Sequence, residues 1–264
     1  MNLENISILL ENCFNYTGLF ILFLHIHPSL DIKNWFRMKA HVLFLSFLFG
    51  FILIIVCGCE KDDYGNKQFI DSRDGNVYRT VRIGDQEWMA ENLRFIPNLV
   101  SPGSNSRVSS CYYVYEYNGV DVNEAKSTAN YKGYGVLYNW VAAVESCPKG
   151  WHLPRYSEWM KLVDYLGGEN IAASKLKKSG TTFWEAPNTG AVNDTGFSAL
   201  PGGVCSMNGT FNYMGYYGYW WISAEKNEIF GWYMKMSSGF TRVYSDYYRK
   251  EVGYSVRCIR DQST

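Results

Sequence analysis

An uncharged apolar run at residues 42–56 divides this chain into two parts with different physical requirements. The run follows Lys39 and ends in the sequence Cys57-Gly58-Cys59. A basic residue, an apolar stretch and small residues, in that order, are typical of a secretory signal. With Cys57 and Gly58 the run is about 17 residues long, which is the lower limit for a helix that spans a bilayer. We therefore expect the folded domain after Cys59, with a retained transmembrane anchor as the alternative.

The end of this run resembles a bacterial lipobox, in which small residues precede a lipidated cysteine. The resemblance implies that residues 38–58 are a lipoprotein signal peptide and that Cys59 carries the lipid. Residues 59–69 would then form a tether, and its acidic cluster at 60–63 resembles the surface-export signal of Bacteroidetes lipoproteins. We expect the protein at the cell outer membrane, anchored in its lipid through Cys59 and exposed at the cell surface. A plain solvated tether is the alternative for the acidic cluster.

Residues 1–37 precede this signal and fit poorly with it. Secretory signals begin near their basic residues, whereas here 37 residues stand before Met38. We predict that Met38 is the true start and that residues 1–37 are an extension produced by a mis-assigned start.

The composition of the chain limits the classes of partner. There are 25 Lys+Arg against 25 Asp+Glu, so no positive field exists that would attract nucleic acid. Hydrophobic residues make up 47% of the chain, which is enough to bury a sizeable core. Aromatic residues reach 17%, with 21 Tyr, 15 Phe and 9 Trp. We expect most of the tryptophans in the core, and a strand through Trp220-Trp221 would point one ring inward and one outward.

Hydrophobic periodicity predicts a mixture of helices and short strands. Period-two alternation and β-prone composition indicate strands at 77–83, 86–89 and 111–117. Apolar residues at helical spacing indicate helices at 135–146, 157–166 and 171–178. Ser157 is the expected N-cap of the second helix. Pro, Gly, Ser and Asn predict a loop at 97–109, and the segment 183–259 reads as short strands broken by turns.

Six segments in a fixed order carry a resemblance to a known family. They are IGDQEWMAENL (83–93), GYGVLYNW (133–140), CPKGWHLPRYSEW (147–159), DTGFSALPGG (194–203), YWWISAE (219–225) and YSVRCIRD (254–261). Together they resemble the Fibrobacter succinogenes major paralogous domain of bacterial surface lipoproteins, over residues 70–262. That family has no established common reaction, so the resemblance implies no activity.

Two of these segments are similar to parts of better known folds. Residues 150–159 resemble the helix entry of formylglycine-generating enzymes, and the segments at Cys147 and Cys258 resemble the cysteine pair of C-type-lectin-like domains. The resemblance implies an α+β, C-type-lectin-like fold with two main helices packed on small twisted antiparallel sheets with long loops. It also implies a Cys147–Cys258 disulfide, and we expect Cys111 and Cys205 to form a second one. Free buried thiols are the alternative for these cysteines.

Catalytic and metal-binding patterns are missing from the sequence. No phosphate-binding glycine loop, nucleophile elbow or zinc-protease pattern occurs, and His152 is the one histidine after Cys59. We expect His152 to be structural, no metal site and no cofactor. A structural calcium ion lacks a supporting motif, because the lectin-like sequence Glu185-Ala186-Pro187-Asn188 contains an inserted alanine. The sequence therefore predicts a protein that is not an enzyme.

Two tyrosine clusters are the candidate ligand-binding residues, because flat rings stack on sugars or pack on protein partners at little entropic cost. The candidates are Tyr216, Tyr217, Tyr219, Tyr244, Tyr247 and Asp246. We expect a ligand-binding or adhesion domain for a carbohydrate or a surface protein, with no nucleic acid partner. A structural component of the outer envelope, or an enzyme with an unrecognised site, are the alternatives.

Overall fold

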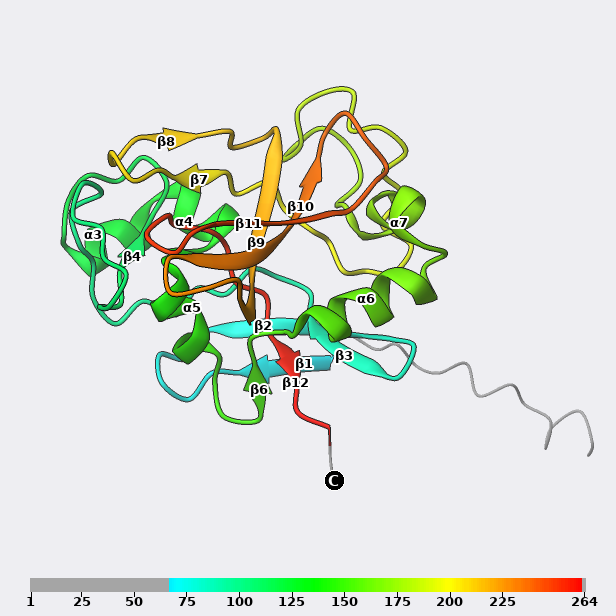
Figure 1. The fold of residues 1–264 in the computed structure, drawn as a ribbon, viewed down its shortest axis with the longest axis horizontal. Helices are drawn as coiled ribbons and strands as arrows, with labels where there is room; N and C mark the ends of the chain where they lie inside the picture. Colours follow the sequence, from blue (N-terminus) through cyan, green and yellow to red (C-terminus); the bar gives the residue numbers. More distant parts are fainter. Residues whose placement is uncertain (1–66, 263–264) are drawn as a thin grey trace, which may run out of the picture. The chain divides into compact units, whose positions relative to one another are not determined.

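The computed structural model describes residues 67–262, shown as the coloured ribbon in Figure 1. The predicted extension, signal peptide, lipidation site at Cys59 and most of the tether lie outside the described residues. None of the helices within 67–262 has the length and apolar character needed to cross a bilayer.

The described chain is a mixed α+β structure with short helices and small sheets. Its helices are α3 (Val122–Ser127), α4 (Ala129–Tyr134), α5 (Trp140–Ser146), α6 (Tyr156–Tyr165) and α7 (Glu169–Leu176). The first six strands are β1 (Lys67–Ile70), β2 (Val77–Ile83), β3 (Gln86–Met89), β4 (Tyr112–Tyr113), β5 (Leu137–Tyr138) and β6 (Trp151–His152). The remaining strands are β7 (Val204–Cys205), β8 (Phe211–Asn212), β9 (Tyr217–Glu225), β10 (Phe230–Ser237), β11 (Tyr244–Arg249) and β12 (Ile259–Arg260).

Two sheets organise these strands. One has five strands in the order β1-β2-β3-β12-β6, and the other has three in the order β11-β10-β9. The pairs β4–β5 and β7–β8 form two further small sheets, and every pairing of named strands is antiparallel. This architecture confirms the α+β class and the small antiparallel sheets expected from the sequence.

The predicted hairpin at the start of the domain is confirmed. Strands β2 and β3 have the predicted bounds and pair antiparallel, with Ile83 opposite Gln86. Gly84 lies between them at φ +60°, in the left-handed region that favours glycine. Strand β1 pairs with β2, so residues 67–69 of the segment expected to be a tether belong to the sheet.

The predicted helices need three corrections. The helix expected at 135–146 begins at Trp140, because Tyr138 in β5 exchanges backbone hydrogen bonds with Tyr254. The next helix has Arg155 as its N-cap, where the Glu158 carboxylate accepts the Arg155 backbone N–H at 2.8 Å, so Ser157 lies inside the helix. The third predicted helix begins two residues earlier than expected, at Glu169.

Two short helices were not predicted from the sequence, and most of one predicted strand is not formed. Helices α3 and α4 are six residues each, and side chains cap both: Asp121 accepts the N–H of Asn123, and Thr128 accepts the N–H of Tyr131. The strand expected at 111–117 is reduced to β4, because Glu116 at φ +59° turns the chain.

Two hydrophobic cores lie on opposite sides of the long strands β9 and β10. Helices α6 and α7 lie on one side, whereas α3, α4 and α5 lie on the other (Figure 1). Trp220 belongs to the core under α6 and α7, and Trp221 belongs to the other core. Both rings are fully buried, so the expectation of one inward and one outward ring is wrong: the sheet is covered on both faces at this position.

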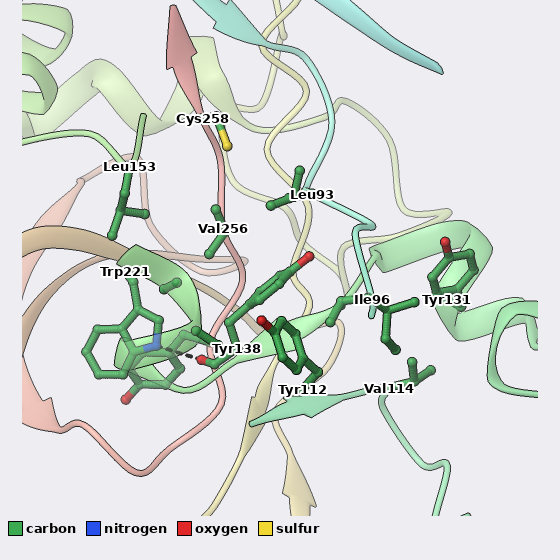
Figure 2. Close-up of a cluster of buried hydrophobic side chains, with 14 of the residues drawn as sticks. Leu93, Ile96, Tyr112, Val114, Tyr131, Tyr138, Leu153, Trp221, Val256 and Cys258 are labelled. Carbon is green, nitrogen blue, oxygen red and sulfur yellow. Dashed lines mark hydrogen bonds between the residues drawn. The ribbon is translucent and has the colours of Figure 1, made fainter. Parts of the chain in front are cut away.

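The core that contains Trp221 is rich in tyrosine, and we call it the tyrosine-side core. Its tyrosines are Tyr78, Tyr112, Tyr131, Tyr138, Tyr233 and Tyr254. Figure 2 shows part of it, with the Trp221 indole N–H donating to the Tyr138 carbonyl at 2.8 Å. The opposite core, which we call the tryptophan-side core, contains Trp88, Trp159, Trp184 and Trp220 with Met234 and Met236.

One of the two expected disulfides is present. Cys147 and Cys258 are bonded, with their Cα atoms 5.9 Å apart, and the bridge joins the end of α5 to the last strand region. The expected Cys111–Cys205 bridge is absent, and both residues are buried free thiols. The Cys111 sulfur faces the carbonyls of Ser104 and Ser109 at 3.6 Å each, so it contacts the 97–109 loop instead of a second sulfur.

Candidate functional site

The register of the three-stranded sheet brings the two predicted tyrosine clusters together. Lys235 in the central strand β10 lies opposite Tyr219 of β9 and opposite Tyr244 of β11. Tyr233, two residues earlier, lies opposite Asp246. Because alternate residues of a strand share a face, Tyr219, Lys235, Tyr244 and Asp246 project from one side of the sheet.

We call this side the tyrosine face. It comprises Tyr213, Tyr217, Tyr219, Lys235, Tyr244, Asp246 and Tyr248. The face continues outward from the tyrosine-side core through ring contacts: Tyr219 stacks on Tyr254 at a centroid distance of 4.9 Å, and Tyr217 stacks on Tyr219 at 5.8 Å. Tyr213 meets Tyr217 edge-on at 5.6 Å. The row of rings therefore runs from buried to exposed.

Lys235 lies between the two clusters. Its ammonium is 5.8 Å from the centroid of Tyr217 and 5.3 Å from that of Tyr244. Arg242 also lies over Tyr244, at 5.0 Å. Cation–π attraction therefore holds the rings of different strands around one positive charge.

Exposure differs across the predicted site residues. Tyr217, Tyr219 and Tyr244 are half-buried and Asp246 is exposed. Tyr216 is 52% exposed and lies in the turn before β9.

The structure separates Tyr247 from the other predicted residues. It pairs with Trp232 in the register, and its ring lies 5.2 Å from the Trp232 ring on the opposite side of the sheet from Tyr244. Tyr247 is 40% exposed there. Strand β11 thus presents tyrosines on both of its sides, and only the side with Tyr244 belongs to the tyrosine face.

The phenol of Tyr219 on this face, and that of Tyr233 beside it in β10, are uncharged donors at neutral pH. Burial raises the pKa of Tyr219 well above its ordinary value, and burial raises the pKa of Tyr233 to about 12. The face offers hydroxyl groups, one ammonium at Lys235 and one carboxylate at Asp246. Such a set suits stacking and hydrogen bonding with a polar, uncharged molecule.

Comparison with known proteins identifies the family. A family model described as the Fibrobacter succinogenes major domain matches residues 81–260. The chain belongs to this family. No curated protein and no solved structure matches it.

The match covers every residue of the tyrosine face, because the Fibrobacter succinogenes major domain here extends beyond both Tyr213 and Tyr248. It also covers Glu158 and His152, the histidine expected to be structural. The His152 ring nitrogens lie 2.6 Å from Asp261 and 2.9 Å from Glu158, at the entry of α6. Since Glu158 also caps α6, this cluster joins the helix to the chain end.

Within residues 67–262 no group of three or more His, Cys, Asp or Glu side chains is arranged to hold a metal ion. The buried Lys177 ammonium donates to the carbonyls of Thr189, Ser237 and Phe240 at 3.0–3.1 Å, and burial lowers its pKa to about 8. This lysine therefore ties the end of β10 to the loops that contain Thr189 and Phe240.

Sequence reasoning missed Lys235 as a member of the site. The segment of β10, FGWYMKMS, places Lys235 two residues from Tyr233 and one residue from each of Met234 and Met236. Alternation alone would have put Lys235 on the side away from the methionines. Its position between Tyr217 and Tyr244 depends on the pairing of β10 with both neighbours.

Proposed function

We propose that this protein is a lipid-anchored cell-envelope protein whose domain binds carbohydrate through the tyrosine face. The observation that carries the proposal is the convergence of tyrosines from β9 and β11 on Lys235, with Asp246 at the exposed edge. The C–H surface of a sugar ring packs on the electron-rich face of a phenol, while hydroxyl, ammonium and carboxylate groups hydrogen-bond the sugar hydroxyls.

The anchor is the second part of the proposal. The apolar run at 42–56 and the Gly58-Cys59 sequence support cleavage before Cys59 and lipid attachment to it, with the domain held at the outer membrane. A Cys59→Ala variant should lose incorporation of labelled lipid and leave the membrane fraction. Unchanged membrane retention of that variant would favour the alternative of a transmembrane anchor.

A C-type-lectin-like arrangement is the finer fold that we propose. It is supported by the Cys147–Cys258 bridge at the carboxyl end and by helices α6 and α7 against the long strands β9 and β10. We propose no bound calcium, because the sequence lacks the calcium-site motifs of sugar-binding lectins.

The test of carbohydrate binding uses the full chain, solubilised in detergent, on an array of neutral saccharides. We expect binding by the unmodified chain and a loss of about tenfold or more in the Tyr217→Ala/Tyr244→Ala variant, since each stacked ring contributes about 0.5–1.5 kcal/mol. The matched control is Tyr247→Ala, which removes a tyrosine from the same strand on the opposite side of the sheet. Its binding should stay unchanged.

The alternatives give different results in the same experiment. A purely structural envelope component would bind no saccharide and would be recovered with a stoichiometric protein partner. Equal loss of binding in the Tyr247→Ala control would place the ligand away from the tyrosine face.

A further inference from the structure

A separate pocket of about 150 Å³ opens on another part of the domain. Arg79 of β2 and the residues that follow β3 form one wall, the end of α4 forms a second, and the segment after α7 forms a third. A protein cavity of about 150 Å³ is large enough for benzene, so this pocket suits a small molecule or one sugar ring. None of the tyrosine-face residues lines it.

The charged side chains that line this pocket are mostly positive. Four are cationic, Arg79, Arg94, Lys132 and Lys178, and one is a carboxylate, Glu91. Four positive charges against one negative charge leave a net positive charge of three around this small pocket. Charges of one sign that line a concave site concentrate the electric potential there.

Glu91 positions both arginines of the pocket. The Arg79 Nε donates to Glu91 Oε1 at 3.1 Å, and an Arg94 terminal nitrogen lies 3.8 Å from Glu91 Oε2. Within the described part of the chain, Glu91 Oε2 is buried and accepts no hydrogen bond. One carboxylate therefore holds two guanidinium groups near the pocket without neutralising both.

A buried fifth cation lies behind the pocket. Arg257 is fully buried and donates to the side chain of Asn92 at 2.9 Å and to the carbonyl of Ser198 at 3.3 Å. Asn92 and Ser198 both line the pocket. Burial lowers the pKa of Arg257 to about 9, which leaves the guanidinium charged at neutral pH. All its hydrogen-bond acceptors are neutral groups, so its charge adds to the positive potential of the pocket.

Two aromatic rings complete the lining. Tyr134 and Phe183 meet edge-on with their centroids 5.5 Å apart, and the Lys178 ammonium lies 4.2 Å from the Phe183 centroid. Rings and guanidinium groups together suit a molecule with an apolar body and an anionic group.

We propose that this pocket binds the oxyanion group of a small molecule, a carboxylate, sulfate or phosphate, at a site distinct from the tyrosine face. Arg79 and Arg94, oriented by Glu91, face the anion, while Lys132 and Lys178 supply charge from the other walls. Arginine pairs strongly with such groups because its planar fork matches their oxygens.

Calorimetric titration of the full chain in detergent tests this, with glucuronate, sulfate and inorganic phosphate as anionic probes and glucose as the neutral probe. We expect the chain to bind at least one anion and not glucose. The Lys132→Glu/Lys178→Glu variant should bind about tenfold more weakly or worse, because two ammonium groups that attract the anion become carboxylates that repel it. Binding of glucuronate alone identifies a carboxylate-bearing molecule, whereas binding of all three identifies an oxyanion site without further selectivity.

The matched control is Lys149→Glu, which reverses an exposed lysine that does not line the pocket. The anion affinity of Lys149→Glu should equal that of the unmodified chain. If the Lys132→Glu/Lys178→Glu variant fails to fold, Lys132→Gln/Lys178→Gln replaces it. Failure of all three anions to bind, equal binding of glucose, or equal loss in Lys149→Glu would overturn the proposal. The Tyr217→Ala/Tyr244→Ala variant should keep its anion affinity, so this site and the tyrosine face are tested independently.

Discussion

The two faces of the β11-β10-β9 sheet use aromatic residues in opposite ways. On one face Trp220, Met234 and Met236 are fully or almost fully buried against α6 and α7. On the other, the rings pass from buried Tyr233 and Tyr254 to half-buried Tyr217, Tyr219 and Tyr244. The same strands therefore supply a closed core on one side and an open row of rings on the other.

The difference shows how a high aromatic content serves two purposes. The indole of Trp220 has one donor, and it is satisfied inside the protein by Asn92 at 3.0 Å. A phenol can bury its ring while its hydroxyl reaches polar partners, so tyrosine suits the boundary between core and solvent. We therefore expect changes on the tryptophan side to affect stability, and changes at the exposed end of the tyrosine side to affect binding.

The largest effect on stability is expected from Trp220→Ala. This ring is fully buried and contacts Trp159 at a centroid distance of 6.3 Å, so its loss leaves a cavity and removes one of the two hydrogen bonds that the Asn92 oxygen accepts. The free energy of unfolding should fall by about 3–5 kcal/mol. Denaturant unfolding followed by fluorescence measures this loss. A loss of less than about 1 kcal/mol would show that this side is not the closed core.

Removal of the disulfide should have the next largest effect, and it acts on the tyrosine-side core, which contains Cys258. The Cys147→Ser/Cys258→Ser variant should lose about 2–5 kcal/mol of unfolding free energy. The parallel control, Cys111→Ser/Cys205→Ser, removes no covalent bond. It should keep the reductant dependence of the unmodified chain in thermal unfolding, because its Cys147–Cys258 bond remains. That dependence should disappear only in the first variant.

High pH should distinguish the two cores. Burial raises the pKa of Tyr138 and Tyr254 well above the unfolded value near 10, so the folded state keeps protons that the unfolded state releases. Their contribution to stability is present below pH 10 and is lost as the pH rises above it, by up to about 1.4 kcal/mol per pH unit for each group. As the pH rises, the tyrosinate absorbance of Tyr138 and Tyr254 should therefore appear together with unfolding. Full tyrosine ionisation in a chain that is still folded would contradict the assigned burial.

The smallest effect on stability is expected from Tyr244→Ala, because the ring is half-buried at the edge strand β11. Its free energy of unfolding should change by no more than about 0.5–1 kcal/mol. Tyr247→Ala, on the other side of the same strand, should show a similar small change. Thermal unfolding of both variants checks this, and a large loss in Tyr244→Ala alone would mean that its ring is structural.

Local patterns predicted those parts of the fold that local contacts determine. The hairpin of β2 and β3 follows from alternation and Gly84, and α6 follows from its apolar stripe. The start of α5 was missed because long-range pairing of Tyr138 with Tyr254 overrides a helical pattern. Helices α3 and α4 are too short to show a period.

The candidate site was predictable in its residues but not in its geometry. Both tyrosine clusters stand out in the sequence, whereas their union around Lys235 and the separation of Tyr247 depend on strand register. The free Cys111 and Cys205 show a similar limit, since an even number of cysteines does not fix which of them pair.

The affinity of the full chain for its best saccharide tests the central claim most directly, when measured for the unmodified chain, Tyr244→Ala and Tyr247→Ala. We predict a several-fold loss for Tyr244→Ala and none for Tyr247→Ala, because only the first ring lies beside Lys235. Equal affinities of all three proteins, or a loss confined to Tyr247→Ala, would contradict binding at the tyrosine face.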